Sequence, residues 1–130
     1  MTATDYALAL TTAAAEAAGD KLARDLIAFD VSEQLVITDV FLLCSAANDR
    51  QVRAVVDAVE ERLLAMGAKP ERREGQREGR WVLLDFGDIV VHVQDDDERA
   101  YYSLERIWRD CPVVPLPETV TQAPRGEAGR

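Results

Sequence analysis

The stretch "VFLLCSAANDRQVRAVVDAVEERLLAMG", residues 40–67, decides the fold because it joins a buried strand to an amphipathic helix. Its first five residues are all apolar, which is typical of a strand covered on both faces near the centre of a sheet. In its second part, apolar side chains recur at helical spacing and form one face. They are Val52, Val55, Val56, Val59, Leu63 and Met66. Asn48 or Asp49 is suited to cap the start of this helix, and Gly67 to end it.

Further helices and strands are predicted on both sides of this unit. They are a helix over 4–18, a strand over 26–31, a weak edge strand around Arg72, a strand hairpin over 81–93 and a helix over 95–110. Thr4 is the expected N-cap of the first helix and Gly19 its stop, while Leu104, Ile107 and Trp108 form the apolar stripe of the last. This order predicts an α/β fold with a mixed sheet of about five strands flanked by helices. The helix of the opening stretch would be a right-handed crossover between two of these strands.

The composition is that of one acidic domain with a tail. The chain has 130 residues, of which 48% are hydrophobic, and a formal net charge of −9. That apolar content suffices for a single core. The prolines from Pro112 onward predict a domain over 1–112 and a Pro/Gly-rich tail over 113–130, disordered beyond about Pro117. The negative charge argues against binding to free nucleic acid, whose phosphates need a basic surface, and is compatible with a basic protein partner.

The sequence gives no sign of export, of a membrane span or of a metal site. No basic region precedes the first apolar run, and no run is long enough to cross a bilayer, so we expect a cytoplasmic protein that makes no membrane contact. Cys44 and Cys111 form no C-x-x-C pair, and His92 is the single histidine. Neither a metal nor a cofactor is therefore predicted.

The hairpin "GRWVLLDFGDIVVHV", residues 79–93, holds the candidate site. One of its faces, with Val91 and Val93, is wholly apolar and belongs against helices. With a loop of two or four residues, the other face carries Trp81, Leu83, Asp85, Asp88, Val90 and His92. A three-residue loop ending at Gly87 would instead take Trp81 off this mixed face. Apolar surface rimmed by polar groups marks a partner site if it is exposed, and the alternative is that a helix covers this face as well.

Three chemical interpretations of these residues are weak. A hydrolase would use His92 with Asp85 or Asp88, but no serine lies in a G-x-S-x-G motif. A nucleotidyltransferase could hold Mg²⁺ on the same two aspartates, but the chain has no phosphate-binding loop. The start of the helix after residue 48 could bind an anion with help from Arg50, although simple capping explains that segment better.

An ordered set of segments resembles the ribosomal silencing factors, also called the Iojap-like family. The matching segments are "DKLARDLIAFDV" (20–31), "ITDVFLLCSAANDRQV" (37–52), "EG" (74–75), "WVLLDFGDIVVHV" (81–93) and "RAYYSLERIW" (99–108). They occur in family order and cover most of residues 4–110. The pattern W-x-L-x-D-x-G-D-x-x-V-H followed by Y-x-L-E-R-x-W is the most specific part.

The resemblance implies both a fold and a function. The fold is expected to be similar to nucleotidyltransferase domains without their catalysis. Family members bind the large ribosomal subunit through the protein numbered fourteenth on its intersubunit face. They block joining of the small subunit and reduce translation when nutrients are short, and some form homodimers.

Taken together, the sequence predicts a non-enzymatic repressor that binds a ribosomal protein and neither reads nucleic acid sequence nor touches a membrane. The expected partner-binding residues are Trp81 as anchor, with Leu83, Asp85, Phe86, Asp88, Val90 and His92 around it. A metal-dependent nucleotidyltransferase-like enzyme and a dimeric scaffold are the alternatives.

Overall fold

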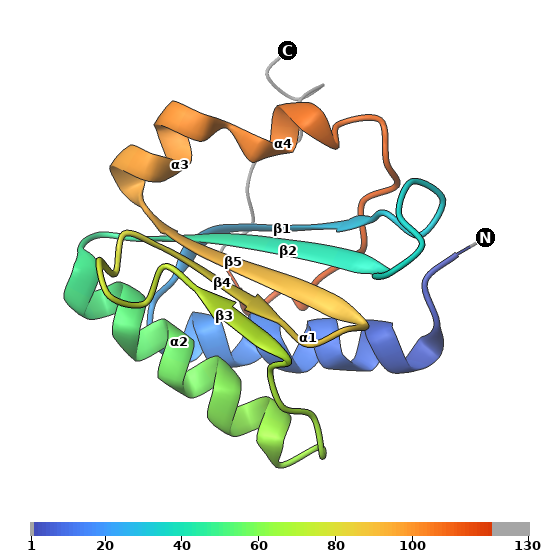
Figure 1. The fold of residues 1–130 in the computed structure, drawn as a ribbon, viewed down its shortest axis with the longest axis horizontal. Helices are drawn as coiled ribbons and strands as arrows, with labels where there is room; N and C mark the ends of the chain where they lie inside the picture. The colour runs from blue at the N-terminus through green and yellow to red at the C-terminus, as the bar shows by residue number, and fades with distance from the viewer. Residues whose placement is uncertain (1, 121–130) are drawn as a thin grey trace.

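Five strands form one mixed sheet within residues 2–120, the part of the chain that the computed structural model describes (Figure 1). The strands are β1 (Arg24–Asp30), β2 (Val40–Ala46), β3 (Arg72–Glu74), β4 (Trp81–Asp85) and β5 (Ile89–Asp95). Their order across the sheet is β1-β2-β5-β4-β3. β2 runs parallel to β5, and the other neighbouring pairs are antiparallel. The predicted α/β class with a mixed, five-stranded sheet is confirmed.

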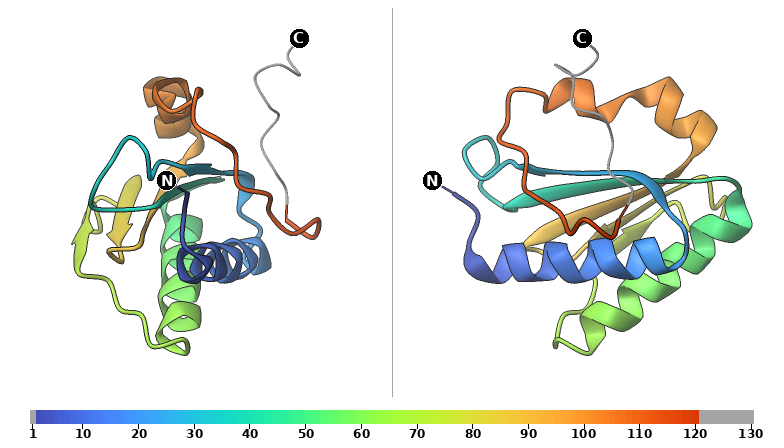
Figure 2. Two further views of the ribbon diagram at one scale, coloured as in Figure 1. Left: turned by 90° about the vertical axis from the view of Figure 1, so that its right-hand side faces the viewer. Right: turned by 180° about the vertical axis from the view of Figure 1, so that it is seen from behind.

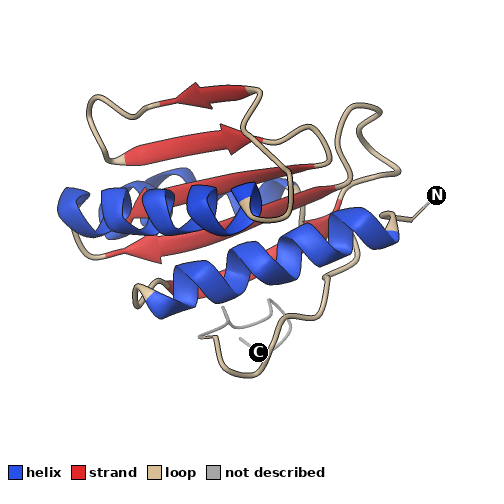
Figure 3. Cartoon of the chain, turned by 90° about the horizontal axis from the view of Figure 1, so that it is seen from below, coloured by secondary structure: helices blue, strands red, loops and turns tan. Residues whose placement is uncertain are grey.

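The helices lie on both faces of the sheet (Figures 1 and 3). α1 (Asp5–Asp20) and α2 (Asp49–Leu64) cover one face, while α3 (Asp96–Tyr102) and α4 (Leu104–Ile107) lie over the other. α2 leaves β2 and leads to β3 at the far edge, so that the β4–β5 hairpin fills the two positions between. None of the helices within 2–120 is both long and apolar enough to cross a bilayer.

α1 follows the prediction at its start and departs from it at its end. The Thr4 hydroxyl accepts a hydrogen bond from the backbone N–H of Ala7 at 3.0 Å, as expected of an N-cap. The helix continues through Gly19 to Asp20, so the prediction that Gly19 stops it is wrong. Gly19 serves packing instead, because an added Cβ would lie 3.1 Å from a methyl group of Val120.

α2 carries the predicted apolar stripe except at its last member. Val52, Val55, Val56, Val59 and Leu63 are all buried. Met66 is 39% exposed, which corrects the prediction that it continues this face. The helix ends at Leu64, and Met66 lies in the turn before Gly67, where helical periodicity no longer sets the direction of a side chain.

The predicted last helix is broken into two short pieces. Ser103 takes a left-handed conformation (φ 43°, ψ 54°) and its N–H donates to the carbonyl of Arg99, which closes α3. The break turns α4 so that Leu104 and Trp108 pack against β1 and β2. Ile107 is left exposed, so only part of the predicted apolar stripe is correct.

Residues 112–120 run beside β1 and add to the core (Figure 2). The N–H of Asp30 donates to the carbonyl of Pro112, and that of Val114 donates to the carbonyl of Ala28, both at 2.8 Å. Val114, Leu116 and Val120 are buried in the same cluster as α1 and α2. Packing therefore extends beyond the boundary predicted at residue 112. The rest of the predicted tail, 121–130, lies outside the described residues.

Candidate functional site

The register of the β4–β5 hairpin decides which residues form the mixed face. Trp81 lies opposite Gln94, and Leu83 lies opposite His92. The N–H of Phe86 donates to the carbonyl of Ile89 at 2.9 Å, which leaves a two-residue loop of Gly87 and Asp88. Of the alternatives left open by the sequence, the even-numbered loop is therefore the one formed, and Trp81 shares a face with His92.

The opposite face of the hairpin is buried under α1 and α2. Val82, Leu84, Phe86, Ile89, Val91 and Val93 all belong to the main core cluster. The inclusion of Phe86 corrects its expected place on the partner-binding patch. Strand alternation continues through residue 86, so its ring points with Leu84 into the core.

His92 is tied to Trp81 by a hydrogen bond across the two strands. The indole Nε1–H of Trp81 donates to Nδ1 of His92 at 3.2 Å. This bond places the proton of the neutral imidazole on Nε2, and the lone pair of Nδ1, the one that could act as a base, is occupied by the indole N–H. Burial lowers the pKa of His92 to about 4. The geometry thus gives His92 a structural role in holding Trp81 and does not support the hydrolase interpretation.

The two aspartates of the hairpin do not converge on one point. Asp85 is half-buried, and its Oδ1 accepts the N–H of Gly87 at 2.9 Å, which braces the turn. Its Oδ2 lies 3.9 Å from a guanidinium nitrogen of Arg72. Asp88 lies in the loop and is exposed. Within residues 2–120, no group of three or more His, Cys, Asp or Glu side chains is arranged to hold a metal ion.

A helical layer covers part of the mixed face, so the site is smaller than the sequence suggested. Val90 and His92 are buried, whereas Trp81, Leu83 and Asp85 are half-exposed. Rings from other elements close over His92. Phe41 lies 5.2 Å from it and 5.1 Å from Trp108, measured between ring centroids. The alternative that helices cover this face therefore holds for its centre and not for its edge.

Two tyrosines of α3 join Trp81 at the surface. The ring centroid of Tyr102 lies 4.9 Å from that of Trp81, and Tyr101 lies 4.8 Å from Tyr102. Tyr101 is 80% exposed. We call Trp81, Tyr101 and Tyr102 the aromatic patch. Both tyrosines lie in the predicted last helix and were not among the expected partner-binding residues, although two adjacent aromatic residues near an acidic helix start could have indicated a binding surface.

A buried arginine fixes the position of α3. Arg99 donates from Nη1 to the hydroxyl of Ser45 and from Nη2 to the carbonyl of Asp25, each at 2.8 Å. Its Nε lies 3.0 Å from a carboxylate oxygen of Glu105 in α4. A buried guanidinium is tolerated only when it is paired in this way. Sequence reasoning missed this residue because its partners lie 54 and 74 positions away.

The start of α2 is capped by side chains, as the sequence favoured. The side-chain oxygen of Asn48 accepts from the N–H of Gln51, and Oε1 of Gln51 accepts from the N–H of Ala47. The amide of Gln51 also donates to the carbonyls of Lys21 and Leu22 at 3.0 Å. Gln51 thus connects α2 to the turn before β1.

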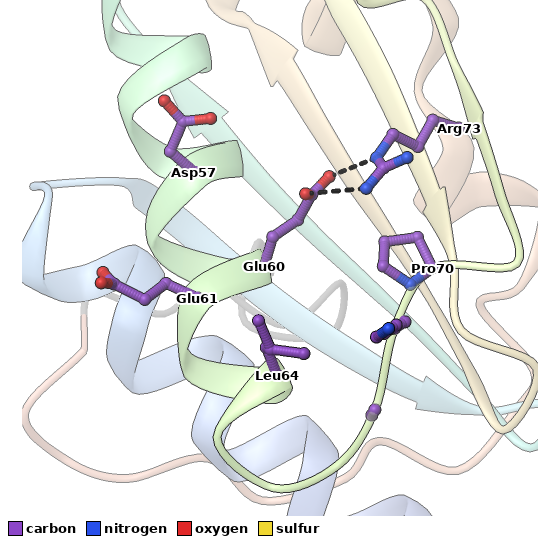
Figure 4. A pocket seen from close by; sticks show the side chains of 8 residues that line it. Asp57, Glu60, Glu61, Leu64, Pro70 and Arg73 are labelled. Atoms are coloured by element: carbon purple, nitrogen blue, oxygen red, sulfur yellow. Dashed lines mark hydrogen bonds and ion pairs between the residues drawn. The ribbon is translucent and has the colours of Figure 1, made fainter.

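A hollow lies between α2 and β3, and no residue of the aromatic patch is part of its lining (Figure 4). It has a volume of about 680 Å³. Its lining is Asp57, Glu60, Glu61, Leu64, Ala68, Lys69, Pro70 and Arg73. Glu60 and Arg73 form an ion pair across it through two hydrogen bonds of 2.7 and 3.1 Å, so these two charges neutralise each other. The hollow is an open surface groove bridged by this salt bridge.

Comparison with known proteins identifies the family. Residues 4–129 match the family model described as "Ribosomal silencing factor during starvation". A ribosomal silencing factor of Bacillus subtilis is 42% identical over 103 residues, which cover 79% of this chain and 87% of that one. A crystal structure from Bacillus halodurans superposes with a TM-score of 0.73 at 37% identity, covering 87% of this chain and 100% of that one.

A more distant relative comes from a eukaryote. The mouse protein named mitochondrial assembly of ribosomal large subunit protein 1 is 27% identical over 89 residues, which cover 66% of this chain and 39% of its own length. The family match spans nearly the whole chain, and the fold agrees with that of a related crystal structure. The chain belongs to the family of ribosomal silencing factors.

Proposed function

We propose that this protein represses translation by occupying the large ribosomal subunit where the small subunit must join. The mechanism is steric, and no catalytic step is part of it. The proposed contact on the ribosome is the protein numbered fourteenth on the intersubunit face, and the proposed setting is nutrient limitation in the cytoplasm. Family membership supports this function, and the name of the mouse relative refers to the large subunit.

The aromatic patch is the observation that carries the proposal. Trp81, Tyr101 and Tyr102 place three aromatic rings side by side at the surface, and the two tyrosines have hydroxyl groups that can meet a polar partner. Large aromatic side chains of this kind often dominate the energy of protein interfaces. Leu83 extends the patch along β4, and Asp85 and Asp88 add negative charge at its far end.

The overall charge favours a protein contact over an RNA contact. At a net charge of −9, the chain is repelled by the phosphates of ribosomal RNA and attracted to basic proteins. This field increases the rate of encounter with a basic partner without setting the final affinity.

Sedimentation of the purified protein with separated ribosomal subunits tests the proposal. The protein should pellet with the large subunit and not with the small one. Trp81→Ala should weaken that binding by about 2 kcal/mol or more if Trp81 is the anchor. Leu64→Ala is the control, because Leu64 is a half-exposed apolar residue at the end of α2, which covers the other face of the sheet.

Two results would contradict the proposal. Binding to the small subunit alone would contradict the proposed function. Unchanged binding of a folded Trp81→Ala protein to the large subunit would show that Trp81 is not the anchor. Because Trp81 also bonds to His92, the variant must first show a normal far-ultraviolet circular dichroism spectrum.

The enzyme and scaffold alternatives have tests of their own. A nucleotidyltransferase would gain thermal stability from nucleotide with Mg²⁺, since a ligand that binds only the native state raises stability. Light scattering on a size-exclusion column would reveal a homodimer. If dimer formation buried the aromatic patch, Trp81→Ala would weaken both the dimer and the complex with the large subunit.

A further inference from the structure

The loop between β1 and β2, residues 31–39, presents two neighbouring aliphatic side chains to solvent. Val36 is fully exposed and Ile37 is 82% exposed. Single exposed aliphatic residues are common on protein surfaces. Two in succession at the tip of a loop, where nothing in residues 2–120 covers them, form a small convex apolar feature that a partner could bury.

The loop is held in shape by backbone hydrogen bonds at its base. The N–H of Val31 donates to the carbonyl of Asp39, and the N–H of Leu35 donates to the carbonyl of Val31, both at 2.8 Å. The N–H of Asp39 donates to the carbonyl of Asp88, and a carboxylate oxygen of Asp39 accepts from the N–H of Thr4. The tip is therefore presented by a fixed base, and docking would cost little conformational entropy.

The surroundings of the tip are acidic. Asp5, Asp30, Glu33, Asp39 and Asp88 lie in the segments that meet at this end of the sheet. Residues 2–9, 30–40 and 86–90 contain no Lys or Arg. The segment that leads to Pro112, whose carbonyl accepts from Asp30, adds Arg109 and Asp110, which carry opposite charges. In Figure 1 the loop lies beside the start of α1.

A hollow of about 410 Å³ lies next to the tip. It is lined by Ser32, Glu33, Gln34, Leu35, Val36 and Asp39. The Asp39 carboxylate and the aliphatic walls suit the side chain of a Lys or Arg, whose stem is apolar and whose end is a cation. RNA phosphates and anionic lipids would be repelled by the same carboxylate.

We propose that this loop is a second docking element, which inserts Val36 and Ile37 into an apolar recess of a basic protein surface. A lysine or arginine of the partner enters the hollow beside the tip. The proposal rests on the proposed function in taking that surface to belong to a protein of the large ribosomal subunit.

The loop and the aromatic patch lie at opposite ends of the sheet. The loop leads into Val40 at the start of β2, whereas Trp81 pairs with Gln94 near the end of β5, the parallel neighbour of β2. A seven-residue strand separates the two by about 20 Å. Attachment at two separated points fixes the orientation of the bound protein, which a steric block of the small subunit requires.

The test compares a double variant with a matched control in titrations against purified large subunits. Val36→Ser/Ile37→Ser should weaken binding at least about tenfold, because the two aliphatic side chains would no longer be buried at the interface. Leu22→Ser is the control, since Leu22 is 75% exposed in the turn before β1. This turn precedes the start of β1, whereas the loop under test follows its end. The control should leave binding unchanged. Melting temperatures of both variants should match the parent protein, because none of the three side chains is buried.

The possible outcomes separate this proposal from the proposed function. If the parent protein binds and the double variant binds within twofold of it, the loop proposal is overturned and the proposed function stands. If the parent protein does not bind large subunits, the proposed function fails, and the partner named here fails with it. If the parent protein binds large-subunit RNA freed of its proteins and the double variant does not, the loop contacts RNA, and the proposed protein partner is wrong.

Discussion

The two faces of the sheet are built from different kinds of side chain. Under α1 and α2, the buried residues are almost all aliphatic or alanine and form one large cluster. Under α3 and α4, the apolar cluster is smaller and is accompanied by the buried polar residues Ser45, His92, Gln94 and Arg99. The first face supplies most of the hydrophobic stabilisation, and the second face carries the candidate site.

The second face also holds buried polar atoms that lack a hydrogen-bond partner. Nε2 of His92 and both side-chain amide atoms of Gln94 have none within residues 2–120. Each such atom costs about 1–3 kcal/mol relative to a satisfied one. The layer under α3 and α4 is therefore the less stably packed of the two, and it is the layer that carries the aromatic patch.

Two neighbouring leucines on β2 test the difference in packing between the two faces, and the largest effect on stability is expected here. Leu42 points to the first face and Leu43 to the second, and both are fully buried. Leu42→Ala should lower the free energy of unfolding by about 2–5 kcal/mol, and Leu43→Ala by less, because a small layer can close over the lost volume more easily. Urea unfolding of both variants measures this, and an equal or reversed cost would show that the two layers are equally rigid.

Acid should destabilise the protein through His92. Its pKa is about 4 in the folded protein, against 6.5 as the ordinary value. Between pH 4 and pH 6.5, His92 is protonated in the unfolded chain and neutral in the folded protein. The free energy of unfolding is therefore largest above about pH 6.5 and falls by up to about 3 kcal/mol as the pH is lowered to 4. His92→Gln should remove this slope in urea titrations at several pH values, and an unchanged slope would place its origin in other groups.

Arg99→Ala should loosen the packing of α3 and α4 on the second face and leave the first face unchanged. Loss of its bonds to Ser45, Asp25 and Glu105 should cost about 1–3 kcal/mol, because Glu105 is partly exposed and remains solvated. It should also release α3 and change the near-ultraviolet circular dichroism of Trp81 and Tyr102. Leu42→Ala is the control, because it should weaken the fold while leaving that spectrum intact below its melting temperature.

Tyr101→Ser should have the smallest effect on stability and still reduce binding. With 80% of the residue exposed, the free energy of unfolding should change by less than about 0.5 kcal/mol. Affinity for the large subunit should fall, because the ring extends the aromatic patch. An unchanged affinity would confine the contact to Trp81 and Tyr102.

Much of the site could be predicted from residues close in sequence. Alternation along β4 and β5 placed Trp81, Leu83, Val90 and His92 on one face, and the structure agrees for the even-numbered loop. The tyrosines could not be added in the same way. Tyr102 reaches Trp81 because Arg99 ties α3 to residues of β1 and β2, and no local pattern encodes that contact.

The sequence by itself determined the elements whose signals are local. The stripe of α2, the caps at Thr4 and Asn48, and the burial of β2 all follow from spacing within one or two turns or along one strand. Their energies depend on neighbours a few positions apart, so periodicity is enough to reveal them.

Only the tertiary structure decided how these elements meet. It placed β5 beside β2, broke the last helix at Ser103 and packed residues 112–120 along β1. Each of these outcomes depends on contacts between residues distant in sequence, where burial and hydrogen bonding outweigh local propensity. The same contacts decide which part of the mixed face stays exposed, and therefore where a partner can bind.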